Sequence, residues 1–294
     1  QGTVTLTDWL DITAGGRYQS EDRALARASV GLRNVDGGAT PLLQFRPDST
    51  RATNFSPKVS FDFRPVDDVL IYLSWAQGFK SGTYNIVNIL TTPDYVKPEE
   101  VSSFELGLKS TVLNGSMRLN AAVFHTEIKE LQTSFISAQS GGLIRFENAG
   151  SARIYGAEFD TLWSPFQEWN PGFVATANGA YVHAEFTDFS EGSGFDEATG
   201  LFFGPSSLIP LPGFGGRDFS GNRITRTPRF SGSVGLSQLI DAAHGSWEFA
   251  ADLYYNSGFY FLAQNSPVSH ESAYHVVNAR VSYLHEPWNL RLTV

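Results

Sequence analysis

The sequence of 294 residues contains no cysteine, and this and other shortages each exclude a class of protein. Without cysteine, neither a disulfide scaffold nor a cysteine-ligated zinc site can form. No apolar run reaches the 18 residues that a transmembrane helix needs, which excludes a helical membrane protein. Charged residues make up 17%, where soluble domains average about 25%. Basic residues are outnumbered 21 to 30 by acidic ones, so we expect no nucleic-acid partner.

Aromatic residues and glycine are abundant instead. The chain contains 23 Phe, 11 Tyr, 6 Trp and 28 Gly residues. So many aromatic side chains argue against a disordered chain, because they supply apolar surface that folding can bury.

Apolar and polar residues alternate with a period of two along most of the chain, which predicts β-strands. In the segment FELGLK, which begins at Phe104, the apolar side chains fall on one face, and Glu105 and Lys109 fall on the other. The same separation recurs in segments 155–163 and 275–283. Helical spacing is scarce, so the sequence predicts an all-β protein.

The pattern predicts about twelve strands, joined alternately by short turns and long loops. They are expected at residues 1–6, 9–22, 54–64, 69–80, 101–113, 116–135, one ending near 164, 172–188, 227–239, 246–258, 273–284, and 288 onward. Asn114-Gly115 is a strong hairpin signal, and residues 189–226 form the longest loop. Short turns on one side and long loops on the other are typical of a transmembrane antiparallel β-barrel. Strands of twelve residues also suffice to cross a bilayer.

In such a barrel the apolar face contacts lipid and the polar face lines the lumen. The lumen-facing candidates, which would contact a domain inside the barrel, are Glu105, Lys109, Glu158 and Asp160. Aromatic residues near strand ends would form interfacial girdles, and they are Tyr72, Trp75, Trp163, Tyr255, Tyr283 and Trp288. The alternative is a soluble β-domain whose aromatic residues fill a core.

A succession of short motifs carries a more specific signal. They are WLDITAGGRY at 9–18, NFSPKVS at 54–60, PVDDVLIYLSWAQGFKSG at 65–82, VKPEE at 96–100, SFELGLK at 103–109, ENAG at 147–150, YGAE at 155–158 and RTPRF at 226–230. In this order they resemble the β-barrel of TonB-dependent outer-membrane receptors, over nearly the whole chain. Gly150 is expected to supply unusual dihedral angles at a turn or bulge.

The resemblance implies a 22-stranded barrel with an N-terminal plug and a TonB box. Neither plug nor TonB box is recognisable, and both chain ends fall within alternating runs. We therefore expect residues 1–294 to be a partial barrel from a longer protein. The resemblance also implies the outer membrane of a Gram-negative bacterium, with lipid and lipopolysaccharide around the barrel. The whole receptor would import a scarce solute, most commonly a ferric siderophore, energised by the TonB–ExbB–ExbD complex.

Patterns for catalysis and metal binding are absent from the sequence. Its six histidines are scattered and form no HExxH pair, and Lys80-Ser81 lacks the glycine loop of a phosphate-binding site. Four loop carboxylates, Asp188, Glu191, Asp196 and Glu197, lack the spacing of an EF-hand. We expect no enzyme, no catalytic residue, no metal site and no cofactor.

The candidate solute-binding residues lie in two long loops. The first group is Phe202, Phe203, Phe214, Arg217, Phe219 and Arg223, and the second, weaker group is Tyr84 and Tyr95. Aromatic rings and guanidinium groups suit a planar anion such as a ferric catecholate complex. The alternative is that these phenylalanines pack on one another or on the barrel rim.

Other functions remain open within and beyond this class. The same family includes importers of cobalamin, glycans and other nutrients. A passive porin-type channel would have no plug. A barrel enzyme or an adhesin would need a clustered catalytic set or repeated loop modules, and neither is visible.

Overall fold

The computed structural model describes residues 1–25, 28–45, 48–85, 95–137, 143–148, 150–204, 215–288 and 290–294. These residues form strands, turns and two short 3-10 helices, η2 (Pro267–Ser269) and η3 (Glu286–Trp288). Within these ranges, no helix has the length and apolar character needed to cross a membrane.

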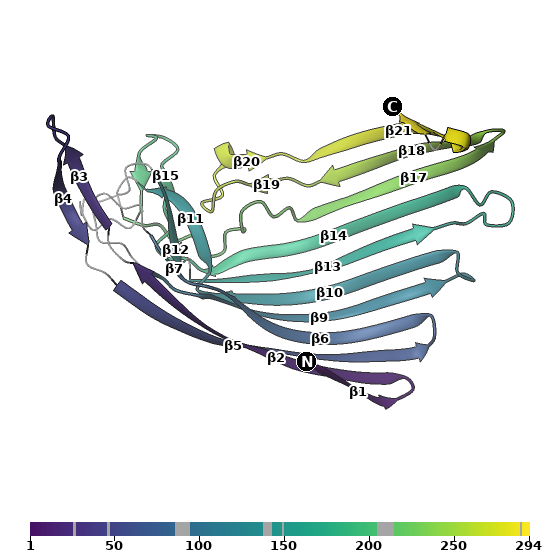
Figure 1. Cartoon of the computed structure of the whole chain (residues 1–294), viewed down its shortest axis with the longest axis horizontal. Coiled ribbons are helices and arrows are strands. Elements are labelled where there is room, and N and C mark those ends of the chain that lie inside the picture. The colour runs from purple at the N-terminus through teal and green to yellow at the C-terminus, as the bar shows by residue number, and fades with distance from the viewer. Residues whose placement is uncertain are drawn as a thin grey trace.

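Twelve strands form one antiparallel sheet in which each strand pairs with its neighbours in chain order (Figure 1). They are β1 (Gly2–Thr7), β2 (Leu10–Leu25), β5 (Asp48–Val66), β6 (Val69–Lys80), β9 (Glu99–Val112), β10 (Met117–Lys129), β13 (Ser151–Trp163), β14 (Phe173–Asp188), β17 (Phe230–Ala242), β18 (Gly245–Asn256), β21 (Tyr274–His285) and β22 (Leu290–Thr293). The expected number of strands and their antiparallel order are confirmed. The sheet is curved but open, with β1 and β22 at its edges.

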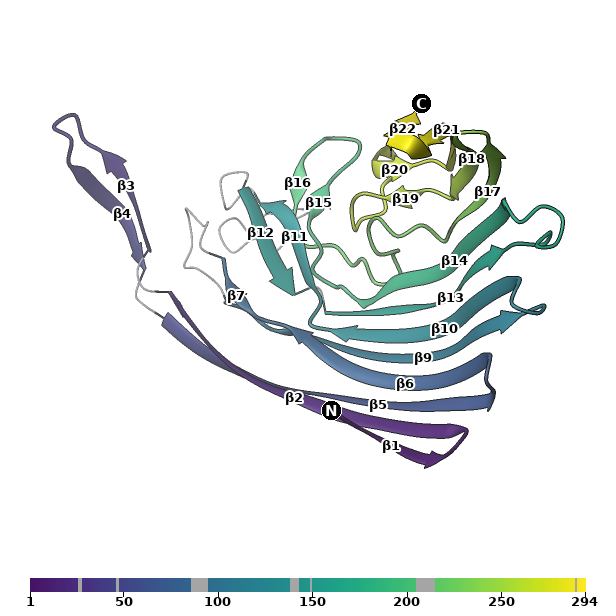
Figure 2. The same cartoon turned by 45° about the vertical axis from the view of Figure 1, so that its right-hand side comes forward.

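Five small hairpins extend the long connections at one end of the sheet, while the short turns lie at the other end (Figure 2). They are β3 (Ala28–Arg33) with β4 (Ala39–Phe45), β7 (Thr83–Tyr84) with β8 (Tyr95–Val96), β11 (Gln132–Ser137) with β12 (Leu143–Asn148), β15 (Gly194–Phe195) with β16 (Phe202–Phe203), and β19 (Phe259–Tyr260) with β20 (His270–Glu271). The expected division into a short-turn end and a long-loop end is confirmed.

Two expected boundaries were wrong. The stretch between the strands expected at 9–22 and 54–64, expected as a long loop, contains the end of β2, the β3–β4 hairpin and the start of β5. The strand expected at 116–135 is divided between β10 and β11. The division occurs at Glu130, whose φ of 52° lies in the left-handed region and ends the extended ladder.

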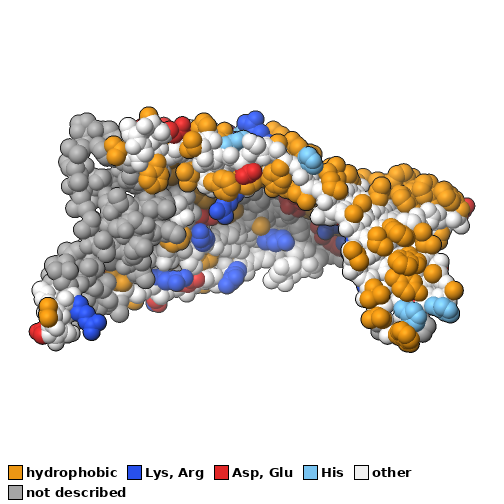
Figure 3. All heavy atoms as spheres, turned by 90° about the horizontal axis from the view of Figure 1, so that it is seen from above, with side chains coloured by type: hydrophobic (Ala, Val, Ile, Leu, Met, Phe, Trp, Pro, Cys, Tyr) orange, Lys and Arg blue, Asp and Glu red, His pale blue; other side chains and the backbone are white. Residues whose placement is uncertain are grey.

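The strand register gives the sheet one apolar face and one polar face. One cross-strand row joins Leu73, Leu106, Val123, Ala157, Tyr181 and Phe230. Leu106 is 48% exposed and Val123 is 50% exposed, so this face is uncovered by other elements among the described residues. Figure 3 shows hydrophobic side chains gathered on the outside of the curved sheet and both basic and acidic side chains within its hollow. This division fits lipid outside and a polar lumen inside.

The end of the apolar band is visible in two further rows on the outer face. The first row joins Trp75, Phe104, His125, Tyr155 and His183, and the next joins Gln77, Ser102, Glu127, Arg153 and Glu185. The Tyr155 ring stacks on His183, with centroids 4.7 Å apart. A change from apolar to aromatic to charged rows is the expected order at a membrane surface. We therefore place the long-loop boundary of the hydrocarbon at the Tyr155 row.

The longest loop continues the wall of the sheet. β14 pairs with β17 only as far as Tyr181, and beyond it β14 bonds to the loop. The Phe186 N–H donates to the Asn222 carbonyl at 2.9 Å, and the Ile224 N–H donates to the Ala184 carbonyl at 3.1 Å. This pairing covers a small buried core of four phenylalanines, Phe186, Phe189, Phe203 and Phe219.

Candidate functional site

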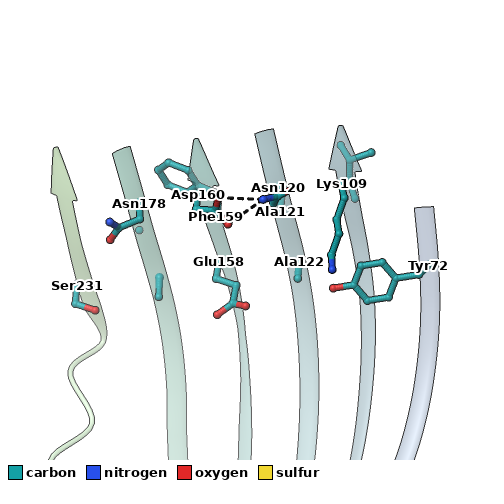
Figure 4. A pocket seen from close by; sticks show the side chains of 13 residues that line it. Tyr72, Lys109, Asn120, Ala121, Ala122, Glu158, Phe159, Asp160, Asn178 and Ser231 are labelled. Carbon is teal, nitrogen blue, oxygen red and sulfur yellow. Dashed lines mark hydrogen bonds between the residues drawn. The ribbon is translucent and has the colours of Figure 1, made fainter. Parts of the chain in front are cut away.

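A cavity of about 510 Å³ lies on the inward face of the sheet, where neighbouring strands align their polar residues (Figure 4). Its lining includes Tyr72 from β6, Lys109 from β9, Glu158 and Asp160 from β13, and Asn178 from β14. These side chains point inward, because along each strand they alternate with the side chains of the lipid-facing rows.

Hydrogen bonds hold several of these groups in place. The Tyr72 hydroxyl donates to Glu105 Oε1 at 2.6 Å, and Lys109 Nζ lies 5.6 Å from the centre of the Tyr72 ring. The Asn120 amide donates to both oxygens of Asp160, at 3.0 and 3.3 Å. The polar side of the sheet therefore brings three carboxylates and one ammonium group into one band.

All four lumen-facing candidates lie on this band: Glu105, Lys109, Glu158 and Asp160. Their summed formal charge is 1 − 3 = −2, which suits a partner that presents basic or hydrogen-bond-donating groups. Tyr72 belongs to the same band, and its expected place in an interfacial girdle was wrong. The alternation in β6 contained the missed signal, because Tyr72 has the opposite parity to Ile71 and Leu73.

The other candidate region is the long loop that contains Arg217. The Arg217 guanidinium carbon lies 3.9 Å from the centre of the Phe203 ring, and one of its nitrogens donates to Asp196 Oδ2 at 2.9 Å. The Arg217 side chain remains 49% exposed. A cavity of about 490 Å³ opens beside Arg217, Asp196 and Gln264.

Asp196 is stabilised as a carboxylate by the loop around it. Its Oδ1 accepts hydrogen bonds from the Thr199 hydroxyl at 3.0 Å and from the backbone N–H groups of Thr199 and Ala198. The bond from Arg217, followed by those from Thr199, lowers the pKa of Asp196 to about 2. Asp196 therefore carries its full negative charge near neutral pH.

Two of the four phenylalanine candidates are buried. Phe203 and Phe219 are 2% and 4% exposed, and their rings pack together with centroids 6.1 Å apart. Both rings belong to the buried phenylalanine core of the loop, and the Arg217 guanidinium lies over the Phe203 ring. The backbone of Phe202 pairs with Phe195 in the β15–β16 hairpin. Phe214 lies outside the described residues.

The Arg223 guanidinium bonds within the protein. It donates to the Thr227 carbonyl at 3.0 Å and lies 5.7 Å from the centre of the Tyr260 ring. Burial, followed by the nearby charge of Arg229, lowers the pKa of Arg223. These contacts anchor the loop to its neighbour.

Tyr84 and Tyr95 lie together at the long-loop end of β5. Their ring centroids are 5.2 Å apart, and the Tyr84 hydroxyl donates to Asp48 Oδ2 at 3.1 Å. Burial raises the pKa of Tyr95. In the described part of the chain, no contact joins these tyrosines to Arg217, so the two predicted groups form separate regions.

We call the long connections at the long-loop end of the sheet the outer loops. Sequence reasoning missed the side-chain amides that connect them. Asn148 belongs to the ENAG motif, for which only a turn or bulge was expected, but its amide donates to the carbonyls of Lys97 and Glu130, at 3.1 and 2.8 Å. Gly150 has a φ of +59°, which confirms its unusual backbone conformation. Across the described ranges, no group of three or more His, Asp or Glu residues is arranged to hold a metal ion.

Comparison with protein families gives one match that covers the whole chain. The family model described as TonB dependent receptor-like, beta-barrel matches residues 1–294. The pesticin receptor of Yersinia enterocolitica is 25% identical over 246 residues, covering 83% of this chain and 30% of the relative. The pesticin receptor of Yersinia pestis is 25% identical over 249 residues with the same coverage. The chain thus spans about 30% of the length of these curated relatives.

Solved structures share the fold. The ferric yersiniabactin uptake receptor FyuA from Yersinia pestis superposes with a TM-score of 0.71 at 21% identity, over 97% of this chain and 37% of that one. BauA, the ferric preacinetobactin receptor from Acinetobacter baumannii, gives a TM-score of 0.63 at 16% identity, over 99% of this chain and 36% of that one. At these identities the likeness shows a common β-barrel architecture.

Proposed function

This chain belongs to the TonB-dependent receptor-like β-barrel family of Gram-negative outer-membrane proteins, and we propose that it is part of a receptor that imports a ferric siderophore. The observation that carries the proposal is the family match over residues 1–294. The substrate class is supported by the structurally similar proteins, because they include receptors for ferric yersiniabactin and ferric preacinetobactin. The role is transport, and we assign no catalytic residue to the chain.

Residues 1–294 would supply part of the barrel wall, and the plug and TonB box would lie elsewhere in the same polypeptide. The acidic inward band, with Glu105, Lys109, Glu158 and Asp160, would contact the plug. Its net negative charge and its tyrosine-supported carboxylate favour basic plug residues. The TonB–ExbB–ExbD complex would supply energy by pulling on the plug from the inner membrane.

The solute would meet the outer loops first. Arg217 is the strongest candidate contact, because its guanidinium is half exposed beside an open cavity. Phe202, Phe214, Tyr84 and Tyr95 would add ring surface, while Phe203, Phe219 and Arg223 would hold the loops in shape. The apolar outer rows would contact outer-membrane lipid, with lipopolysaccharide at the Tyr155 row.

The test is growth of a receptor-deletion strain that carries the full-length gene, supplied with one iron source at a time. We expect one ferric siderophore to support growth only when both the receptor and TonB are present. In that strain Arg217→Ala should reduce siderophore uptake about tenfold, the effect of one charge-assisted contact. Lys129→Ala, an exposed substitution outside the proposed solute region, should leave uptake unchanged.

The alternatives predict different outcomes of the same test. Receptor-dependent use of cobalamin or a glycan, with no iron phenotype, would replace the siderophore proposal. Uptake that persists without TonB and without the plug would indicate a passive porin-type channel. Equal uptake by the Arg217 variant and the wild type would remove Arg217 from the solute-binding region.

A further inference from the structure

In the described parts of the outer loops, four side-chain amides each bond twice to the backbone of one residue in another loop segment. We call such a contact an amide bridge: the amide oxygen accepts from the N–H of that residue, and the amide nitrogen donates to its carbonyl. An Asn or Gln side chain can do this because it carries an acceptor and a donor side by side, as a peptide group does. Each amide bridge therefore forms the same pair of hydrogen bonds as one residue pair of a β-sheet, between two loop segments that are not paired as strands.

Two amide bridges join the loop between β6 and β9 to the loop between β10 and β13. Asn85 donates to the Phe146 carbonyl at 2.7 Å and accepts from the Phe146 N–H at 2.9 Å. Asn148 accepts from the Lys97 N–H at 2.8 Å and donates to the Lys97 carbonyl at 3.1 Å. Gln132 adds bonds to the carbonyls of Ser81 and Lys97, at 3.0 and 2.9 Å. We call the described parts of these two loops the first loop body.

Two more amide bridges join the loop between β14 and β17 to the loop between β18 and β21. Gln264 accepts from the Phe195 N–H at 3.0 Å and donates to the Phe195 carbonyl at 3.2 Å. Asn265 accepts from the Arg223 N–H at 2.7 Å and donates to the Arg223 carbonyl at 2.9 Å. Asn222 also donates to the Ala263 carbonyl at 2.9 Å. We call the described parts of these two loops the second loop body.

The contact between the two loop bodies is of a different kind. Leu131, from the first loop body, packs against the cluster of Phe186, Phe189, Phe203 and Phe219. In the part of the chain that the structure describes, each of the four amide bridges joins two loops of the same body, and none joins one body to the other. Paired hydrogen bonds fix both distance and angle, whereas apolar contact is non-directional and tolerates sliding.

We propose that these four outer loops move as two rigid bodies, each held by its own pair of amide bridges and meeting at Leu131. Asn85, Asn148, Gln264 and Asn265 are the positioning residues, and Gln264 and Asn265 hold the loop that presents Arg217. The inference concerns loop motion and stands whichever solute the receptor imports.

Amide hydrogen exchange of the full-length receptor in lipid tests the proposal, because the N–H groups of Phe146, Lys97, Phe195 and Arg223 report the four bridges. Asn265 has a φ of 53°, so the informative variant is Asn265→Gly, which keeps the left-handed backbone and removes the amide. We expect exchange at Arg223 to become about three- to tenfold faster, as for the loss of one hydrogen bond. Phe195 should follow in part, while Lys97 and Phe146 stay unchanged.

Asn148→Ala is the matched variant in the first loop body, and it should accelerate exchange at Lys97 but not at Arg223. Asn265→Asp, which keeps an acceptor for the Arg223 N–H, should restore part of the protection there. Acceleration in both bodies by either single variant would show one cooperative unit and overturn the proposal. Wild-type exchange at all four N–H groups in both variants would show that the amide bridges do not hold the loops, and would overturn it as well.

Discussion

At the scale of single residues, aromatic rings cover glycines on neighbouring strands. Tyr72 and Gly107 are cross-strand partners on the inward face, and Phe159 and Gly179 are partners on the outer face. A Cβ added to Gly107 would lie 2.3 Å from the Tyr72 ring. The glycine thus leaves room for the ring, and the ring position lets the hydroxyl of Tyr72 reach Glu105.

Gly107→Val should displace the Tyr72 ring and break its bond to Glu105. We expect the unfolding free energy to fall by about 1–3 kcal/mol, as for overpacking. Urea unfolding of the receptor in lipid vesicles measures the change. Gly78→Ala is the matched control, since nothing lies within 4 Å of its added Cβ. Equal stability of the Gly107 variant and the wild type would contradict the ring-over-glycine account.

The Asp196 carboxylate should titrate well below its ordinary range. Its pKa is lowered from 3.8 to about 2 by the bonds from Arg217 and Thr199. A lowered pKa means that the bonds stabilise the loop fully above pH 3.8, and that this contribution disappears as the pH falls toward 2. The carboxyl ¹³C shift of labelled Asp196 reports the midpoint, with Asp196→Asn to assign the signal. In Arg217→Ala the midpoint should rise, and a wild-type midpoint near 3.8 would disprove the pairing.

At the scale of single strands, each strand of the large sheet has one face toward lipid and one face toward the polar lumen. β6 places Ile71 on the outer face opposite Phe63 and Leu108, and it places Ser74 on the inward face opposite Glu105. Ile71 lies in the same outer row as Phe159, which is four residues from both Tyr155 and Trp163 on β13. Ile71 therefore lies near the middle of the apolar band.

Ile71→Arg should be costly and Ser74→Arg should not be. A charged side chain near the bilayer midplane destabilises a barrel by about 2–4 kcal/mol, whereas a lumen position keeps it in polar surroundings. The unfolding free energy in lipid vesicles distinguishes the two variants of this one strand. If both variants lost equal stability, the assignment of faces in β6 would be wrong.

At the scale of the whole molecule, the two ends of the sheet face different compartments. The small hairpins and the candidate solute region share the long-loop end, and the short turns share the other end. In a transmembrane barrel the long loops face the cell exterior and the short turns face the periplasm. The Tyr155 row then marks the outer surface of the membrane.

Labelling of single cysteines should reveal this orientation, since the chain contains no cysteine of its own. Glu197→Cys, in the loop after β15, should react with a membrane-impermeant maleimide on intact cells. Asp67→Cys, in the turn between β5 and β6, should react only after the outer membrane is permeabilised. Both positions are exposed, so access depends on the compartment alone. The reverse labelling pattern would invert the orientation.

The fold could be predicted from the sequence because its main signal is local. Alternation with a period of two assigns each side chain to a face without knowledge of distant partners. This was enough to place Glu105, Lys109, Glu158 and Asp160 on the inward face and to expect about twelve antiparallel strands. The same rule applied to Tyr72 would have avoided the error at that residue.

The outer loops could not be predicted, because their contacts join segments far apart in the chain. Phe203 and Phe219 became buried, Arg217 stayed half exposed, and Asn265 paired with Arg223 across 42 residues. No pattern in the sequence indicates which distant residue a loop amide or phenylalanine will contact. Those partners come together only when the sheet has folded. The sequence alone thus determined the two-faced sheet, whereas the tertiary structure decided which loop residues support the rim and which remain open to a solute.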